Sequence, residues 1–111
     1  MIFKIFSILY NLLKELIKII TEVFILPVIS MFLGIIIRMF NKNEHNPPHF
    51  HAYYQGSEAI FNMEGEIIKG EFPKRQTKFV AAWAELHKEE LLANWELAVE
   101  NQPLYNIEPL R

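Results

Sequence analysis

The chain has 111 residues, the length of one ordinary domain, and it contains no cysteine. Disulfides and thiolate metal sites are therefore excluded, and the lack of disulfides suits the reducing cytoplasm, where we expect the protein to be located. The formal net charge is −2, so there is no overall basic excess of the kind that binds nucleic-acid phosphates. All 13 acidic residues are Glu, which rules out a mechanism that depends on Asp.

Residues 1–25 are predicted to form an amphipathic helix with a wide apolar face. Its polar residues recur at steps of one, three and four, which places all of them on one stripe of a helix. They are Lys4, Ser7, Asn11, Lys14, Glu15, Lys18, Thr21 and Glu22. The longest uncharged run, 23–37, is shorter than the roughly 18 apolar residues of a membrane span, and it contains Pro27 and Gly34. A transmembrane helix is therefore not expected here.

Three alternatives for this helix stay open from the residues alone. It could pack on the protein's own domain, lie on a membrane surface, or pair with a partner helix, since its amphipathic pattern suits each. A secretory signal peptide fits poorly, because Lys14, Glu15 and Lys18 interrupt the apolar region and no small-residue cleavage site follows.

Residues 26–111 are expected to form a single α+β domain. Apolar residues between 29 and 40 predict two short strands, or one bent strand with Gly34 at the bend. Alternation predicts a strand at 49–54. A hairpin is expected from 58–63 and 66–69, because Glu64-Gly65 suits the positive φ of a tight turn.

A long helical tract is predicted to follow Pro73 and to continue to about residue 100, either as one helix or as two with a break near His87. Phe79, Trp83 and Trp95 recur at helical spacing and are assigned to the core. Residues 105–110 could add an edge strand. The fold class is thus α+β: a small antiparallel sheet packed against one long or two consecutive C-terminal helices, with an extra N-terminal amphipathic helix.

The segment with the most concentrated chemistry is the histidine cluster at 45–51. On a strand, His49 and His51 point to the same face, and two adjacent imidazoles can bind a metal through nitrogen. His45 could fold back as a third ligand across the Pro-Pro loop, and His87 could supply a fourth. The metal hypothesis therefore assigns His45, His49, His51 and His87 to a divalent transition metal such as zinc.

Two other interpretations of the same cluster stay open. In a catalytic hypothesis, His49 and His51 act as base and acid on RNA while Arg75 holds the phosphate. In a structural interpretation, the histidines satisfy backbone carbonyls and the two prolines shape a turn. The sequence alone does not choose among the three.

Several motifs together resemble a known family. They are Gly34-Ile-x-Ile37, His45-x-Pro-Pro-His-Phe-His-Ala52, Pro73-x-Arg75, and Trp83-Ala-Glu-x-His87 followed by Trp95. Over residues 26–111 the chain resembles the bacterial family of unknown function DUF4160. The family pattern places Asp before the first histidine, where this chain has Glu44, so the carboxylate is kept with a longer reach.

The resemblance implies a partner and a set of candidate positions, but no established activity. Members are often encoded beside another small protein, so the expected partner is the product of a neighbouring gene in a toxin–antitoxin-like module. The family hallmark falls on His45, His49 and His51, with His87 and Arg75 as outer candidates. Two functions follow: a histidine site that binds metal or cleaves RNA, or a non-enzymatic, antitoxin-like adaptor that binds its partner.

The resemblance also suggests where the domain begins. Family members begin Met-Pro-x-Ile-Ser, and the corresponding text here is Leu26-Pro27-Val28-Ile29-Ser30. A leucine codon can start translation in bacteria, so the resemblance implies that residues 1–25 are translated upstream sequence or follow from a misassigned start site. On this interpretation, an intact-mass measurement on the native protein shows no species that carries residues 1–25; such a species would contradict it.

Overall fold

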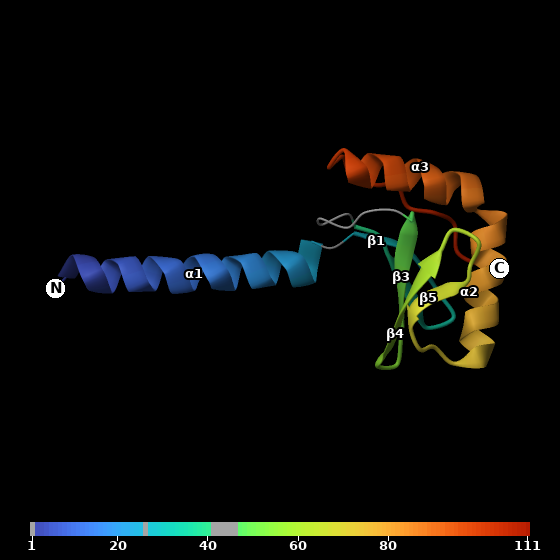
Figure 1. The fold of residues 1–111 in the computed structure, drawn as a ribbon, viewed down its shortest axis with the longest axis horizontal. Helices are drawn as coiled ribbons and strands as arrows, with labels where there is room; N and C mark the ends of the chain where they lie inside the picture. The colour runs from blue at the N-terminus through green and yellow to red at the C-terminus, as the bar shows by residue number, and fades with distance from the viewer. Residues whose placement is uncertain (1, 26, 41–46) are drawn as a thin grey trace.

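Five antiparallel strands pair in the order in which they occur along the chain (Figure 1). The computed structural model describes residues 2–25, 27–40 and 47–111, and gives only the backbone for residues 19–25. The strands are β1 (Val28–Phe32), β2 (Ile35–Arg38), β3 (His49–Tyr54), β4 (Ser57–Asn62) and β5 (Ile67–Gly70). Leu33 and Gly34 separate β1 from β2 with φ values of 51° and 79°. The two-strand alternative for this region is therefore confirmed.

The helices are α1 (Ile2–Ile25), α2 (Lys74–Leu86) and α3 (Lys88–Val99). The predicted helical tract is two helices, because His87 has φ −121° and ψ 25°, which no α-helix continues through. Pro73 precedes α2 as its N-cap residue, and its carbonyl accepts the first helical hydrogen bond, from the Thr77 amide at 2.9 Å. The α+β fold class, with two consecutive C-terminal helices, is confirmed.

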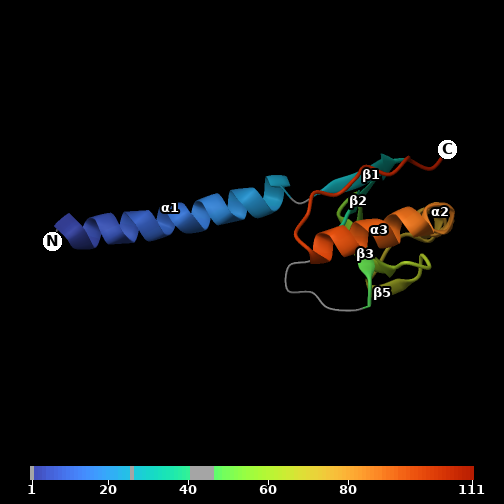
Figure 2. The same cartoon turned by 90° about the horizontal axis from the view of Figure 1, so that it is seen from above.

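The core lies between the sheet and the C-terminal helices. α2 runs along one face of the sheet, and α3 crosses the end at which β3 begins (Figures 1 and 2). Trp83 of α2 is fully buried, and its ring lies 5.3 Å from Phe32 and 5.7 Å from Phe50. Trp95 is also buried and Phe79 is partly buried against the core, so the assignment of these aromatic residues to packing is confirmed.

The opposite face of the sheet, here called the outer face, carries two rows of side chains that run across the strands. Alternate residues of a strand point to opposite faces, so the residues between the core positions define these rows. The first row is Met31, Ile36, Tyr53 and Glu58, and the second is Arg38, His51, Ile60 and Lys69. In the part of the chain that the structure describes, α2 lies against the other face.

α1 extends away from the sheet, as both views show (Figures 1 and 2). Side chains 2–18 are all exposed, so the interpretation that this helix packs on its own domain is wrong for those residues. Among the described helices, none combines the length and the apolar character needed to cross a membrane.

The C-terminal tail runs beside β1 without becoming a strand. The Ile107 amide donates to the carbonyl of Ile29 at 2.7 Å, and Trp83 Nε1 donates to the carbonyl of Glu108 at 2.8 Å. Asn94 adds two further hydrogen bonds, one to the carbonyl and one from the amide of Tyr105. The expected edge strand at 105–110 is therefore wrong, since side chains of α2 and α3, rather than a strand ladder, satisfy much of this backbone.

Two glycines provide a matched test of how the β4–β5 turn packs on α2. Gly65 and Gly56 have similar φ values of 81° and 84°, so an added Cβ is strained at both. At Gly65 that Cβ would also lie 2.6 Å from the Ala81 Cα, whereas at Gly56 it would meet nothing within 4 Å. We expect Gly65→Ala to lower the free energy of unfolding by about 1–3 kcal/mol more than Gly56→Ala does. Equal losses in urea denaturation would contradict this packing.

Candidate functional site

His49 is the first residue of β3, and its imidazole ring contacts Pro47 and Trp95. Its Nδ1 lies 2.9 Å from the carbonyl oxygen of Pro47, and because a carbonyl can only accept, Nδ1 donates. The imidazole ring lies 4.9 Å from Trp95 of α3, and the residue is 6% exposed. The Pro-Pro segment and α3 therefore fix the ring from both sides.

His51 lies two residues further along β3, on the outer face. Its ring stacks on Phe40 with centroids 4.4 Å apart and an interplanar angle of 19°, and the residue is 5% exposed. Nδ1 lies 3.6 Å from a carboxylate oxygen of Glu58, which is beyond hydrogen-bond distance. Glu58 is itself mostly exposed, so it lies at the rim of the site.

The structure brings His49 and His51 together, as strand alternation predicts. Their ring centroids lie 5.5 Å apart with an interplanar angle of 60°. Phe50, between them, points the other way and stacks on Phe61 in the core. The result is an imidazole pair enclosed by aromatic rings, with one carboxylate at its edge.

His87 occupies a different part of the fold, at the break between α2 and α3. Its Nδ1 lies 2.8 Å from a carboxylate oxygen of Glu90, and its ring packs 5.8 Å from Trp83. Within residues 2–25, 27–40 and 47–111, no three His or Glu side chains converge as a group that could hold a metal. His45 and Glu44 lie outside the described residues, so the four-histidine metal set stays a prediction.

Arg75 and the histidine pair lie at opposite ends of β3. Arg75 is in the first turn of α2, with its guanidinium 5.7 Å from the centroid of Phe79. Phe72, just before that turn, contacts Tyr54, the last residue of β3, at 6.4 Å. His49 is the first residue of the same strand, about 17 Å away at 3.3 Å per residue. The predicted pairing of Arg75 with the histidines on one phosphate is not formed in this arrangement.

A feature that residue patterns did not single out is the contact between Arg38 and Tyr53 on the outer face. The guanidinium carbon lies 5.8 Å from the centroid of the tyrosine ring, a cation–π distance. Met31 lies on the same face and is 62% exposed. These residues come from three different strands, so only the register of the sheet brings them together.

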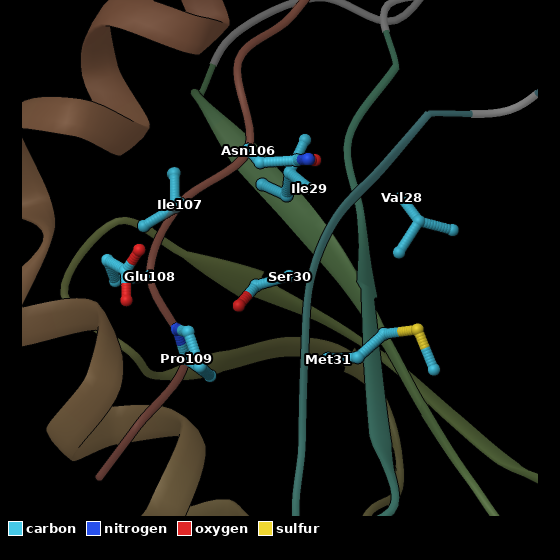
Figure 3. Close-up of a pocket in the computed structure, with 8 residues that line it drawn as sticks. All are labelled: Val28, Ile29, Ser30, Met31, Asn106, Ile107, Glu108 and Pro109. Atoms are coloured by element: carbon cyan, nitrogen blue, oxygen red, sulfur yellow. The ribbon is translucent and has the colours of Figure 1, made fainter.

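A cavity of about 310 Å³ lies between β1 and the C-terminal tail, away from the histidines (Figure 3). It is lined by residues 28–31 and 106–109. Ser30 Oγ is buried there and has no hydrogen-bond partner among the described atoms. Asn106 and Glu108 are the other polar residues of this lining.

Comparison with known proteins gives one match. The family model described as Domain of unknown function (DUF4160) matches residues 34–96. No curated protein and no solved structure matches the chain. The matched region runs from the β1–β2 turn to α3, so it contains the histidine pair and most of the sheet. The chain therefore belongs to the DUF4160 family, whose function is unknown.

Proposed function

We propose that the domain is a non-enzymatic partner-binding module, whose docking surface is the outer face of the sheet. The partner is a protein, the product of the neighbouring gene in a two-gene module. The observation that carries the proposal is the row formed by Met31, Ile36 and Tyr53, which presents apolar and aromatic side chains across three strands opposite α2.

The composition of the two rows fits a protein interface. Tyr, Arg and Met are enriched at the centres of protein–protein interfaces, where they dominate the binding energy. Arg38 and Tyr53 already lie against each other, so part of the entropy of fixing these long side chains is lost before the partner binds. Glu58 and Lys69 end the two rows and supply the charged rim.

The enclosure of the histidines favours binding over catalysis. General acid–base catalysis needs an imidazole nitrogen within hydrogen-bond reach of the substrate. His49 and His51 are almost completely buried, and one nitrogen of His49 is engaged by Pro47. In the proposed module the two rings instead fill the space between Phe40 and Trp95 and keep the strand start in place.

Tyr53→Ala tests the docking surface, and Tyr105→Ala is its matched control. Tyr105 is a tyrosine of the C-terminal tail with 73% exposure, and its hydrogen bonds to Asn94 use backbone atoms only. We expect Tyr53→Ala to weaken the Kd for the neighbouring gene's product by about 10- to 100-fold, as for a hot-spot residue. Isothermal titration of the full chain measures this, and Tyr105→Ala should bind like wild type. Equal affinity for all three proteins would contradict the proposal.

A second candidate function rests on the closeness of the two imidazoles. Rings with centroids 5.5 Å apart can share one divalent metal such as zinc, or act together on RNA, within a toxin–antitoxin-like module. Elemental analysis of the full chain beside a His49→Ala/His51→Ala variant distinguishes this candidate from plain binding. Near-stoichiometric metal that disappears in the variant would favour it, whereas wild-type protein without metal removes the metal form.

A further inference from the structure

The exposed face of α1 is organised as two adjacent seams. Eleven large hydrophobic side chains between residues 2 and 17 are each more than half exposed. Ten of them fall into two series with alternating steps of three and four residues, the spacing of coiled-coil contact positions. The first seam is Ile2, Ile5, Leu9, Leu12 and Leu16, and the second is Phe3, Phe6, Tyr10, Leu13 and Ile17.

The angle between the seams indicates how many helices meet. The second seam follows the first by one residue, so the two directions differ by about 100° around the helix. In a ring of helices, each helix contacts two neighbours, and each contact is a coiled-coil seam. The directions from one helix to its two neighbours differ by about 60° in a ring of three and by about 90° in a ring of four. The seams of α1 are therefore too far apart for a dimer or trimer, and their separation falls between the angle of a ring of four and the angle of about 108° in a ring of five.

The polar stripe lies where such a ring requires it. Ser7, Asn11 and Lys18 lie on the side of the helix opposite the line midway between the two seams. That side would face water in the ring, so no charged group of the stripe enters the interface. One ring of helices therefore buries both seams and leaves the polar stripe in water.

The exposed area is large enough to hold copies of the chain together. Eleven side chains at these exposures present on the order of 1,000 Å² of apolar surface per chain. A typical monomer exposes no contiguous apolar patch larger than a few hundred Å². About 800 Å² per partner suffices for a stable interface. The two seams of one chain together therefore present the area that one partner contributes to a stable interface, divided between two neighbours.

A lipid surface fits the same helix less well. α1 carries three Lys and two Glu, a net side-chain charge of +1, so it gains little attraction from anionic headgroups. Binding to a lipid surface also requires only an apolar helix face and not two separate heptad seams. We propose that α1, in the chain that carries residues 1–25, assembles copies of this chain into a closed ring of four or five helices, from which the DUF4160 domains project.

Sedimentation equilibrium of the full chain, without any partner, tests the proposal. The expected mass is four or five times the 13.1 kDa of one chain. Leu9→Glu/Leu12→Glu breaks the first seam and Phe6→Glu/Leu13→Glu breaks the second, and each should reduce the mass to that of one or two chains. If the first seam contacts the first seam of a neighbouring chain, loss of one seam leaves a dimer. If the first seam contacts the second seam of a neighbouring chain, loss of one seam leaves a monomer.

Ser7→Glu/Asn11→Glu is the matched control, since it adds the same charge to the polar stripe of the same helix. It should keep the mass of the wild-type assembly. A wild-type chain that is a monomer, dimer or trimer would overturn the proposal, and so would seam variants that keep the mass of the wild-type assembly. A monomeric chain that floats with phosphatidylglycerol-containing vesicles would overturn it in favour of a lipid surface. None of these outcomes depends on the neighbouring gene's product, so partner binding and self-assembly are tested separately.

Discussion

Replacing Trp83 with alanine is expected to lower the free energy of unfolding by about 3–5 kcal/mol, the largest effect of any single change considered for this domain. The side chain is fully buried between the sheet and α2, in contact with Phe32 and Phe50. Its removal leaves a cavity at the centre of the core. It also leaves the carbonyl of Glu108 without its indole donor, which loosens the C-terminal tail.

Trp83→Phe separates these two contributions. Phenylalanine keeps most of the aromatic contact but cannot donate to Glu108, so a loss of about 1–2 kcal/mol is expected, with the tail rather than the sheet affected most. Urea denaturation gives the free energies, and amide hydrogen exchange locates the loosened segment. If Trp83→Ala unfolded at the same urea concentration as wild type, the packing described here would be wrong.

The second large effect is expected at the histidine pair. His51→Ala should lower the free energy of unfolding by about 2 kcal/mol, because it removes a buried ring that stacks on Phe40 and lies beside His49. Thermal or urea unfolding of the full chain measures this. A change of less than about 0.5 kcal/mol would contradict a structural role, since substitutions away from packed sites fall in that range.

His51→Gln distinguishes a structural role from a catalytic or metal-binding one. Glutamine nearly keeps the volume of histidine and retains polar atoms, but it cannot act as an acid–base group near neutral pH. If the ring serves packing, His51→Gln should recover much of the stability lost in His51→Ala and should bind the partner normally. Abolition of an activity in both variants, with stability intact in His51→Gln, would instead support chemistry at this site.

Much of the fold could be predicted from local patterns. The strand at His49–Tyr54 follows from alternation, and the turn at Leu33-Gly34 follows from a glycine within an apolar run. The sequence does not decide between one helix and two at His87, because no Gly or Pro marks the break. The conformation of the tail depends on side chains of Trp83 and Asn94, which are distant in sequence, so no local pattern could reveal it.

The candidate site was less predictable than the fold, because it depends on register. Alternation alone places His49 and His51 side by side. It does not say that Arg75 lies at the other end of β3, which follows from the contact of Phe72 with Tyr54. The neighbouring positions of Arg38 and Tyr53 likewise require the β2–β3 pairing. Motif spacing therefore identifies the histidines, but it does not identify the outer face of the sheet, which we propose as the docking surface.

Copurification of the full chain with the product of the neighbouring gene, expressed together, tests the central claim most directly. The account predicts one complex that survives size-exclusion chromatography in wild type and in Tyr105→Ala, and that dissociates in Tyr53→Ala. Separate elution of the two wild-type proteins would contradict it. So would a complex that survives Tyr53→Ala and is lost with Tyr105→Ala, because the partner would then bind the tail rather than the outer face of the sheet.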